Sequence, residues 1–195
     1  DVIGGYKVSN IEVVAAYDIN TTKVGKDLSE AIFSAPNNTI KFSDVPETGV
    51  IVQPGVVNDG VGKFVKDIIT TSPDSENFED SLRDSGAEIL INLLPVGSDE
   101  AVKFYAQSAI NVGIGFINCI PVFIARDKEW YQKFRDAGVP LIGDDIKSQV
   151  GATIVHRVLA QLFSDRGVNL ENTYQLNVGG NMDFLNMLEE DRLET

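Results

Sequence analysis

Short apolar runs and amphipathic runs alternate along the first 145 residues of the chain. Short runs rich in Val and Ile are typical of buried strands, whereas apolar positions spaced three or four apart indicate helices. The predicted strands are 11–17, 49–55, 87–95, 113–121 and 139–145, and the predicted helices are 21–33, a short one before 87, 97–113 and 127–138. This order predicts an α/β fold with a parallel sheet that is covered by helices on both faces.

The pattern changes after residue 145. Apolar residues at helical spacing from 154 to 163 predict a longer amphipathic helix that begins near Ile146 and ends near Gly167. Alternation in 173–180 predicts a half-exposed strand, and another helix begins after it. We therefore predict two domains: residues 1–143 form a nucleotide-binding layer, and residues 144–195 begin an α+β domain.

Charge narrows the range of partners. The 16 Lys and Arg residues are outnumbered by 29 Asp and Glu, which gives a net charge of −13 without a basic stripe. Such a chain repels phosphate backbones and anionic lipid, so we expect no nucleic-acid or membrane partner. We expect a cytoplasmic protein, because there is no signal-peptide pattern and the single cysteine, Cys119, forms no internal disulfide.

Polar residues gather where the predicted strands end, which is where open parallel sheets bind ligands. Asp18 ends the first strand, and an acid there holds the adenosine ribose in dinucleotide sites, although Asp18 could instead cap the next helix. The "PVGS" turn, 95–98, leads into a helix with Ser98 as its cap, and turn chemistry alone accounts for it. Cys119 suits a small buried group and His156 a structural role, and the absence of a Cys/His cluster argues against zinc.

The adjacent acids Asp144 and Asp145 need a different explanation, since neighbouring carboxylates repel each other. One of them can cap the helix expected from Ile146, and the other would then face Lys147 or a bound cation. The stretch "NVGGNMD", 177–183, combines two glycines that allow close backbone approach with polar neighbours. Its alternative interpretation is a β-turn before a capped helix.

Four long stretches together resemble the archaeal and bacterial form of the myo-inositol-1-phosphate synthase family. They are "AAYDINTTKVGKDLSEAIF", "INLLPVGSDEAVKFYAQSAINVGIGFINCIPVFIA", "GDDIKSQVGATIVHRVLAQLF" and "TYQLNVGGNMDFLNMLEEDRLE". The resemblance implies a Rossmann-type domain followed by an α+β domain that serves catalysis and tetramer formation. It also implies conversion of D-glucose 6-phosphate to 1L-myo-inositol 1-phosphate by oxidation at C5, enolisation, aldol closure and reduction. The resemblance further implies that bound NAD undergoes no net redox change. It also implies that this conversion is the first step of inositol and inositol-phospholipid biosynthesis.

The resemblance also implies residue roles. The residues implied to contact NAD are Asp18, Pro95, Val96, Gly97, Ser98, Asn118, Cys119, Pro121, Asp144, Asn177, Gly180 and Asn181. The implied catalytic residues are Asp145, Lys147 and Asp183, and Asp145 is the candidate ligand of a monovalent or divalent cation. Ser148 and Gln149 begin the helix whose N-terminus would favour the substrate's phosphate.

Two family features do not occur in these 195 residues: the Gly-rich turn after the first strand, and the lysine segment that follows "RLE". We therefore expect a central portion of a longer enzyme that is inactive by itself, because enolate and alkoxide charge needs more cations than Lys147. Two alternatives stay open. One is a non-catalytic relative that binds a dinucleotide, and the other is a different Rossmann sugar-phosphate dehydrogenase.

Overall fold

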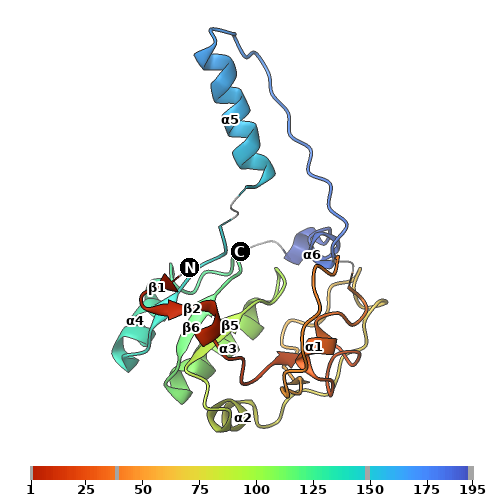
Figure 1. Ribbon diagram of the computed structural model, residues 1–195, viewed down its shortest axis with the longest axis vertical. Helices are drawn as coiled ribbons and strands as arrows, with labels where there is room; N and C mark the ends of the chain where they lie inside the picture. Colours follow the sequence, from red (N-terminus) through yellow and green to blue (C-terminus); the bar gives the residue numbers. More distant parts are fainter. Residues whose placement is uncertain (1, 38–39, 148–149, 193–195) are drawn as a thin grey trace. The chain divides into compact units, whose positions relative to one another are not determined.

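The computed structural model describes residues 2–37, 40–147 and 150–192 (Figure 1). These residues form two compact units. The first unit contains the described residues up to Asp145 and those from Asn181 onward, and the second contains those between Ile146 and Gly180. The chain thus leaves the first unit immediately after the acid pair and returns to it at Asn181.

Parallel strands form the centre of the first unit. β5 (Ile89–Asn92), β6 (Gly115–Asn118) and β7 (Leu141–Ile142) pair in that order, and all of the pairing is parallel. β3 (Tyr17–Asp18) pairs in parallel with β4 (Gln53–Pro54) as a separate sheet. The predicted parallel α/β architecture is confirmed, and the carboxyl ends of its strands carry Asp18, Asn92 and Asn118.

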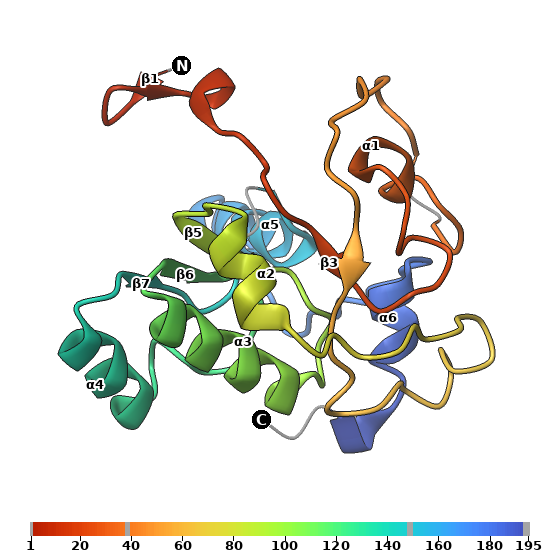
Figure 2. The ribbon, with the colours of Figure 1, turned by 90° about the horizontal axis from the view of Figure 1, so that it is seen from below.

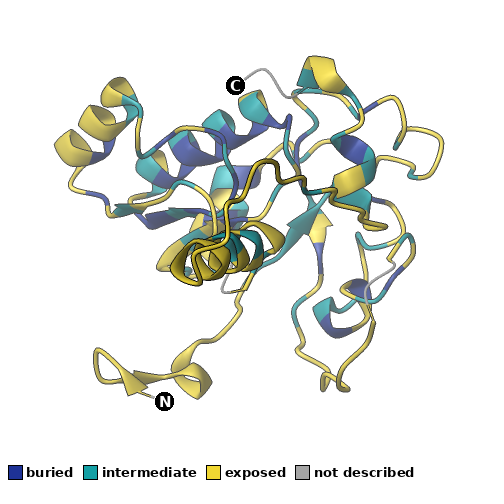
Figure 3. Cartoon of the chain, turned by 90° about the horizontal axis from the view of Figure 1, so that it is seen from above, coloured by how far each residue is buried: buried dark blue, intermediate teal, exposed yellow. Residues whose placement is uncertain are grey.

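Three helices pack on one face of β5, β6 and β7: α2 (Phe78–Asp84), α3 (Asp99–Val112) and α4 (Lys128–Ala137) (Figure 2). Their core residues include Leu82, Val102 and Phe134, which cluster around Phe116 of β6. Figure 3 shows the buried positions gathering on α3 and the strands beside it. Ile89 and Ile91 on the opposite face of β5 are exposed, so the described helices of the first unit cover one face of this strand.

The predicted strand 11–17 is mostly wrong. The chain begins with a short antiparallel hairpin, β1 (Val2–Ile3) and β2 (Tyr6–Lys7), and a 3₁₀ turn, η1 (Val8–Asn10). Only the end of the predicted strand pairs with β4, through a hydrogen bond from the Gln53 amide to the Ala16 carbonyl at 2.8 Å. Ile11 and Val13 remain exposed. Apolar composition alone does not make a strand when no neighbouring strand accepts its hydrogen bonds.

The predicted helix 21–33 shrinks to α1 (Leu28–Ala31). Gly25 adopts a left-handed conformation with φ of 85°, which interrupts a helix, and the N-cap is Asp27 rather than a threonine. The Asp27 carboxylate accepts hydrogen bonds from the Ser29 hydroxyl at 2.5 Å and the Gly49 amide at 2.7 Å. The bond from the Ser29 hydroxyl, together with bonds from the Ser29 and Thr48 amides and the Thr48 hydroxyl, holds the pKa of Asp27 well below its usual range.

The second unit contains α5 (Ala152–Asp165), which begins later than predicted. Its N-cap is Gly151, so neither acid of the pair caps it. The described residues 173–180 form no strand, because no neighbouring segment pairs with them. The chain ends with α6 (Met182–Asn186) and a 3₁₀ turn, η2 (Glu190–Arg192), both in the first unit. No helix within the described ranges is long and apolar enough to cross a membrane.

Candidate functional site

Asp18 lies at the carboxyl end of β3, where the sequence places an acid for ribose binding. One carboxylate oxygen pairs with the Lys23 ammonium at 2.8 Å, and the other accepts the Asn20 amide at 2.8 Å. The two charged side chains are 28% and 30% exposed. A carboxylate has about four lone-pair positions, so these contacts leave capacity for a ribose hydroxyl. The N-cap of α1 is Asp27, so the alternative interpretation, that Asp18 caps the next helix, is wrong.

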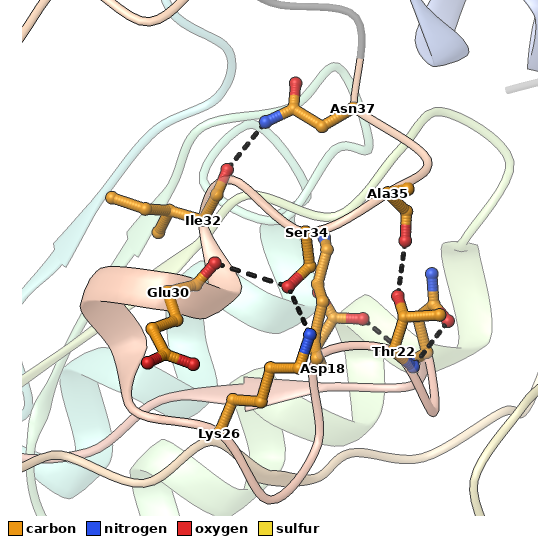
Figure 4. Close-up of polar contacts among 10 residues, drawn as sticks. Asp18, Thr22, Lys26, Glu30, Ile32, Ser34, Ala35 and Asn37 are labelled. Carbon is orange, nitrogen blue, oxygen red and sulfur yellow. Dashed lines mark hydrogen bonds and ion pairs between the residues drawn. The ribbon is translucent and has the colours of Figure 1, made fainter.

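The segment after Asp18 is held in shape by its own polar contacts (Figure 4). The Lys26 ammonium donates to the Ser34 hydroxyl at 2.9 Å, and the Thr22 hydroxyl donates to the Ala35 carbonyl at 2.5 Å. The side-chain amide nitrogen of Asn37 donates to the Ile32 main-chain carbonyl at 2.7 Å. These hydrogen bonds stabilise the non-helical residues on either side of α1, where the apolar spacing predicted a longer helix.

The turn 95–98 leads into α3, and a distant acid completes the start of this helix. Ser98 occupies the N-cap position without making a side-chain cap bond. Instead, the two carboxylate oxygens of Asp59 accept the Glu100 and Ala101 amides, each at 2.8 Å. Because Asp59 uses these amides, the start of α3 is not available to an anionic phosphate. The turn 95–98 can therefore line a cofactor site by van der Waals contact, but the start of α3 cannot bind a phosphate.

Two residues near the end of the described chain, Asn186 and Arg192, hydrogen-bond to the turn 95–98. The side-chain amide nitrogen of Asn186 donates to the Val96 main-chain carbonyl at 2.5 Å. The Arg192 guanidinium donates to the Gly97 carbonyl at 2.8 Å and to the Asp59 carbonyl at 3.1 Å. Gly97 has a φ of 83°, and a Cβ there would come within 2.8 Å of Arg192. The turn therefore requires glycine for its backbone conformation and for this close approach.

A buried chain of amides links the carboxyl ends of β5, β6 and β7. The Asn92 amide nitrogen donates to the Asn118 oxygen at 2.7 Å, and the Asn118 nitrogen donates to the Asp144 carboxylate at 2.8 Å. Asn92 and Asn118 are only 4% and 1% exposed. The Asp144 carboxylate also accepts the amides of three consecutive residues, Ile124, Ala125 and Arg126, at 3.0–3.1 Å. Asp144 thus anchors the loop that follows β6.

The two acids of the pair therefore differ in environment. Asp144 is half-buried within these bonds, whereas Asp145 is exposed and has a φ of 72°. A positive φ is uncommon for residues other than glycine and often marks a functional position. Burial, together with the charge of Asp145, raises the pKa of the Cys119 thiol. Cys119 therefore stays protonated near neutral pH, which suits the small partly buried group that we expected rather than a nucleophile.

A cavity of about 350 Å³ in the first unit brings together residues from distant parts of the sequence. It is lined by Lys23, Ile32, Phe33, Pro36, Asn37, Ile40, Asn181, Met182 and Asp183. Lys23 is the partner of Asp18, so the start of α6 lies near the end of β3. Asn181 accepts the Phe184 amide at 2.8 Å and so caps α6, as the alternative interpretation of this stretch expected.

The remaining candidate residues are less closely associated. Pro121 is half-buried in the loop after β6, and Lys147 is exposed in the second unit. The Asn177 side-chain oxygen accepts the side-chain amide nitrogen of Gln175 at 2.8 Å. At Gly180, an added Cβ would meet nothing within 4 Å. Ser148 and Gln149 lie outside the described residues. No group of three or more His, Cys, Asp or Glu suited to a metal ion occurs within the described part of the chain.

Comparisons with known proteins identify relatives of this chain. A model of the myo-inositol-1-phosphate synthase family matches residues 151–195. Inositol-3-phosphate synthase of Mycolicibacterium smegmatis is 60% identical over 194 residues, which cover 98% of this chain and 53% of that protein. The corresponding enzyme of Corynebacterium glutamicum is 54% identical over 193 residues, covering 98% of this chain and 53% of that protein. The family model thus matches the last 45 of the 195 residues, and both inositol-3-phosphate synthases match nearly the whole chain.

The similarity to these relatives extends along almost the whole chain but along only about half of each relative. Inositol-3-phosphate synthase of Mycobacterium tuberculosis strain H37Rv is 58% identical over 98% of the chain and 53% of its own length. The chain thus spans about half the length of the curated relatives it matches. The crystal structure of Ari2 is similar in fold, with a TM-score of 0.79 and 39% identity over 95% of this chain and 54% of that chain.

Four polar residues of the site did not stand out from the sequence: Asn92, Asp59, Asn186 and Arg192. Asn92 had a detectable signal, because an amide at the end of an apolar strand needs hydrogen-bond partners once it is buried. The other three lie in segments whose partners are about 40 to 130 residues away in sequence. No local pattern reveals such contacts.

Proposed function

We propose that this chain contributes the cofactor-binding layer and part of the active site of an NAD-dependent inositol-3-phosphate synthase. One observation carries the proposal. Asp18, Asn118 and the acid pair lie at the carboxyl ends of parallel strands, in a chain that is 54–60% identical to inositol-3-phosphate synthases over 98% of its length. Open parallel sheets bind their ligands at this edge.

The polar groups at this edge suit NAD. Asp18 would accept the adenosine ribose hydroxyls beside Lys23, and the turn 95–98 would border the adenosine half. The loop that starts with Cys119 and Pro121 would border the nicotinamide half, and Asp144 would hold this loop in place. Asn177, Gly180 and Asn181 would also contact the cofactor, as the resemblance implies. NAD, when bound, accepts the hydride from C5 of the sugar and later returns it to the ring ketone.

The reacting groups would be Asp145, Lys147 and Asp183, with Ser148 and Gln149 near the phosphate of D-glucose 6-phosphate. The Lys147 ammonium would stabilise negative charge on the enolate and aldol oxygens. Asp145 would orient this ammonium or hold a monovalent or divalent cation beside the same oxygens. The proposal includes a cytoplasmic homotetramer that opens inositol and inositol-phospholipid biosynthesis, with the second unit contributing to the subunit contacts.

The test uses the full-length protein with NAD and D-glucose 6-phosphate. We expect the product to be 1L-myo-inositol 1-phosphate and NADH to remain at catalytic level, since the hydride is returned within each turnover. Mass spectrometry or phosphorus NMR identifies the product, and absorbance at the NADH band follows the redox state.

The informative variant is Asp18→Asn, compared with Asp80→Asn on the exposed side of α2 as a charge-matched control. We expect the first to weaken NAD binding by about tenfold, the loss of one charge-assisted hydrogen bond, and the second to leave it unchanged. Steady accumulation of NADH would instead indicate a sugar-phosphate dehydrogenase. NAD binding without any turnover would indicate a non-catalytic relative.

A further inference from the structure

Asn92 is a polar residue at the end of an otherwise apolar strand, and it takes no part in the proposed chemistry. Its side chain accepts the Leu94 amide at 3.2 Å and donates to the Asn118 oxygen at 2.7 Å. Its main-chain carbonyl accepts the Cys119 amide at 3.0 Å. A side chain that is 4% exposed and bonded at both ends has one stable orientation.

The direction of hydrogen bonding along this chain of amides is fixed at its far end. An ionised carboxylate only accepts, so Asn118 must present its nitrogen to Asp144. The second hydrogen of that nitrogen goes to the Val122 carbonyl at 2.6 Å. The Asn118 oxygen must therefore face Asn92, and a donor is required at position 92. Asn92 satisfies this requirement because its own oxygen is occupied by the Leu94 amide.

The chain of amides leads to the functional acid. Asp144 gathers the amides of three residues in the loop 119–126, and the next residue, Asp145, leaves this anchor with a φ of 72°. We propose that Asn92 is a positioning residue, which acts through Asn118 and Asp144 to set the loop 119–126 and the position of Asp145. This inference rests on the proposed function in so far as Asp145 serves catalysis.

The test is Asn92→Asp in the full-length protein, because this change preserves size and removes the donor when the new carboxyl is ionised. Asn118 must then turn its nitrogen toward position 92, which places its oxygen against Asp144. When the new carboxyl is protonated it can donate again. Burial would raise its pKa, and the Asp144 carboxylate, linked to position 92 through Asn118, would act in the same direction. Cys119, whose main-chain amide bonds to the Asn92 carbonyl, is a titratable residue next to this strand end.

We expect kcat of Asn92→Asp to fall by about tenfold to a hundredfold near pH 8, the range that follows when a reacting group is displaced by about 1 Å. The deficit should shrink toward about pH 5.5 as the new carboxyl takes up its proton. KM for NAD should change less than kcat, because Asp18 and the turn 95–98, which would border the adenosine half, are untouched. Asn111→Asp, an exposed position on α3, is the matched control and should keep the wild-type pH profile.

A second readout does not require activity. Alkylation of Cys119, followed by mass spectrometry of its peptide, reports how firmly the loop 119–126 is held. We expect Asn92→Asp to accelerate this labelling relative to wild type near pH 8, with a smaller ratio at lower pH, while Asn111→Asp leaves it unchanged. Equal loss of kcat at every pH, or an unchanged labelling rate, would overturn the positioning role. Absence of inositol phosphate from the wild-type reaction would refute the proposed function instead, and the labelling result would still stand.

Discussion

α3 and α5 are both 14 residues long, and both have an apolar stripe, yet their surroundings differ completely. α3 buries six residues against β5, β6 and α2, whereas α5 buries none within the described structure. Asp59 caps the start of α3 and Gly113 closes its end, whereas α5 begins at Gly151 without a side-chain cap. An amphipathic pattern therefore predicts a helix without indicating whether a partner covers it.

The physical reason lies in the size of each unit. The first unit surrounds α3 with strands and two further helices, so its apolar side chains leave water. The second unit offers α5 only an extended segment, which contacts His156 through the Gln175 and Thr173 side chains. So small a unit cannot enclose an apolar core of its own. His156 thus has the structural role that its sequence context suggested.

The strongest test of this contrast places the same charge on both helices. Val102 of α3 is 0% exposed and Val158 of α5 is 63% exposed. We expect Val102→Asp to destabilise the 195-residue chain by more than about 4 kcal/mol, because it buries an unpaired carboxylate. Val158→Asp should cost less than about 1 kcal/mol. Urea unfolding followed by circular dichroism measures both, and similar losses would contradict the contrast.

The helix caps provide the next test. Asp59→Ala removes both side-chain bonds to the start of α3 and should lower the free energy of unfolding by about 1–2 kcal/mol. Gly151→Asp should do the opposite at α5, where the N-cap backbone is extended and suits a capping acid, and should raise the helicity of that segment. Hydrogen exchange of the α3 and α5 amides distinguishes the two effects. Unchanged protection at the start of α3 in Asp59→Ala would show that Asp59 is dispensable.

A smaller effect follows from Asp99, in the first turn of α3. Burial and the charge of Asp59 raise its pKa, so the ionised form is less favourable in the fold than in the unfolded chain. This penalty exists above the raised pKa and disappears as pH falls below the unfolded value near about 4. Asp99→Asn should therefore stabilise the chain at pH 7 by less than about 0.5 kcal/mol, since the helix start also favours a carboxylate. Chemical unfolding at pH 7 and pH 4 would reveal whether the gain vanishes in acid.

The smallest effect concerns the junction that leads from the first unit toward α5. Asp145 is the secondary cause, after burial, of the raised pKa of Cys119. Asp145→Asn should lower this pKa slightly and increase the rate of Cys119 alkylation at pH 8 by about twofold, because the thiolate reacts. Glu129→Gln on α4 is an exposed control. An unchanged rate would place the Asp145 charge too far from the thiol to matter.

Sequence reasoning succeeded where the signal was local. The predicted helices 97–113 and 127–138 agree closely with α3 and α4, which end at Gly113 and Gly138. It failed for 11–17 and 173–180, because a strand exists only when a neighbour pairs with it. For the acid pair, the sequence predicted that one acid caps the helix expected from Ile146 and that the other faces Lys147 or a bound cation. The structural acid, Asp144, holds a loop rather than capping α5, since the partner amides lie about 20 residues upstream.

The fastening of the turn 95–98 has a consequence for the order of folding. Arg192 reaches the Asp59 carbonyl across 133 residues and the Gly97 carbonyl across 95. α3 contains mainly local contacts and can form as soon as its own residues leave the ribosome. Its entrance cannot close until Arg192 has also emerged, several seconds later at about 5–20 residues per second. The hydrogen bond between Arg192 and the turn 95–98, which would border the cofactor, therefore forms well after α3 has been synthesised.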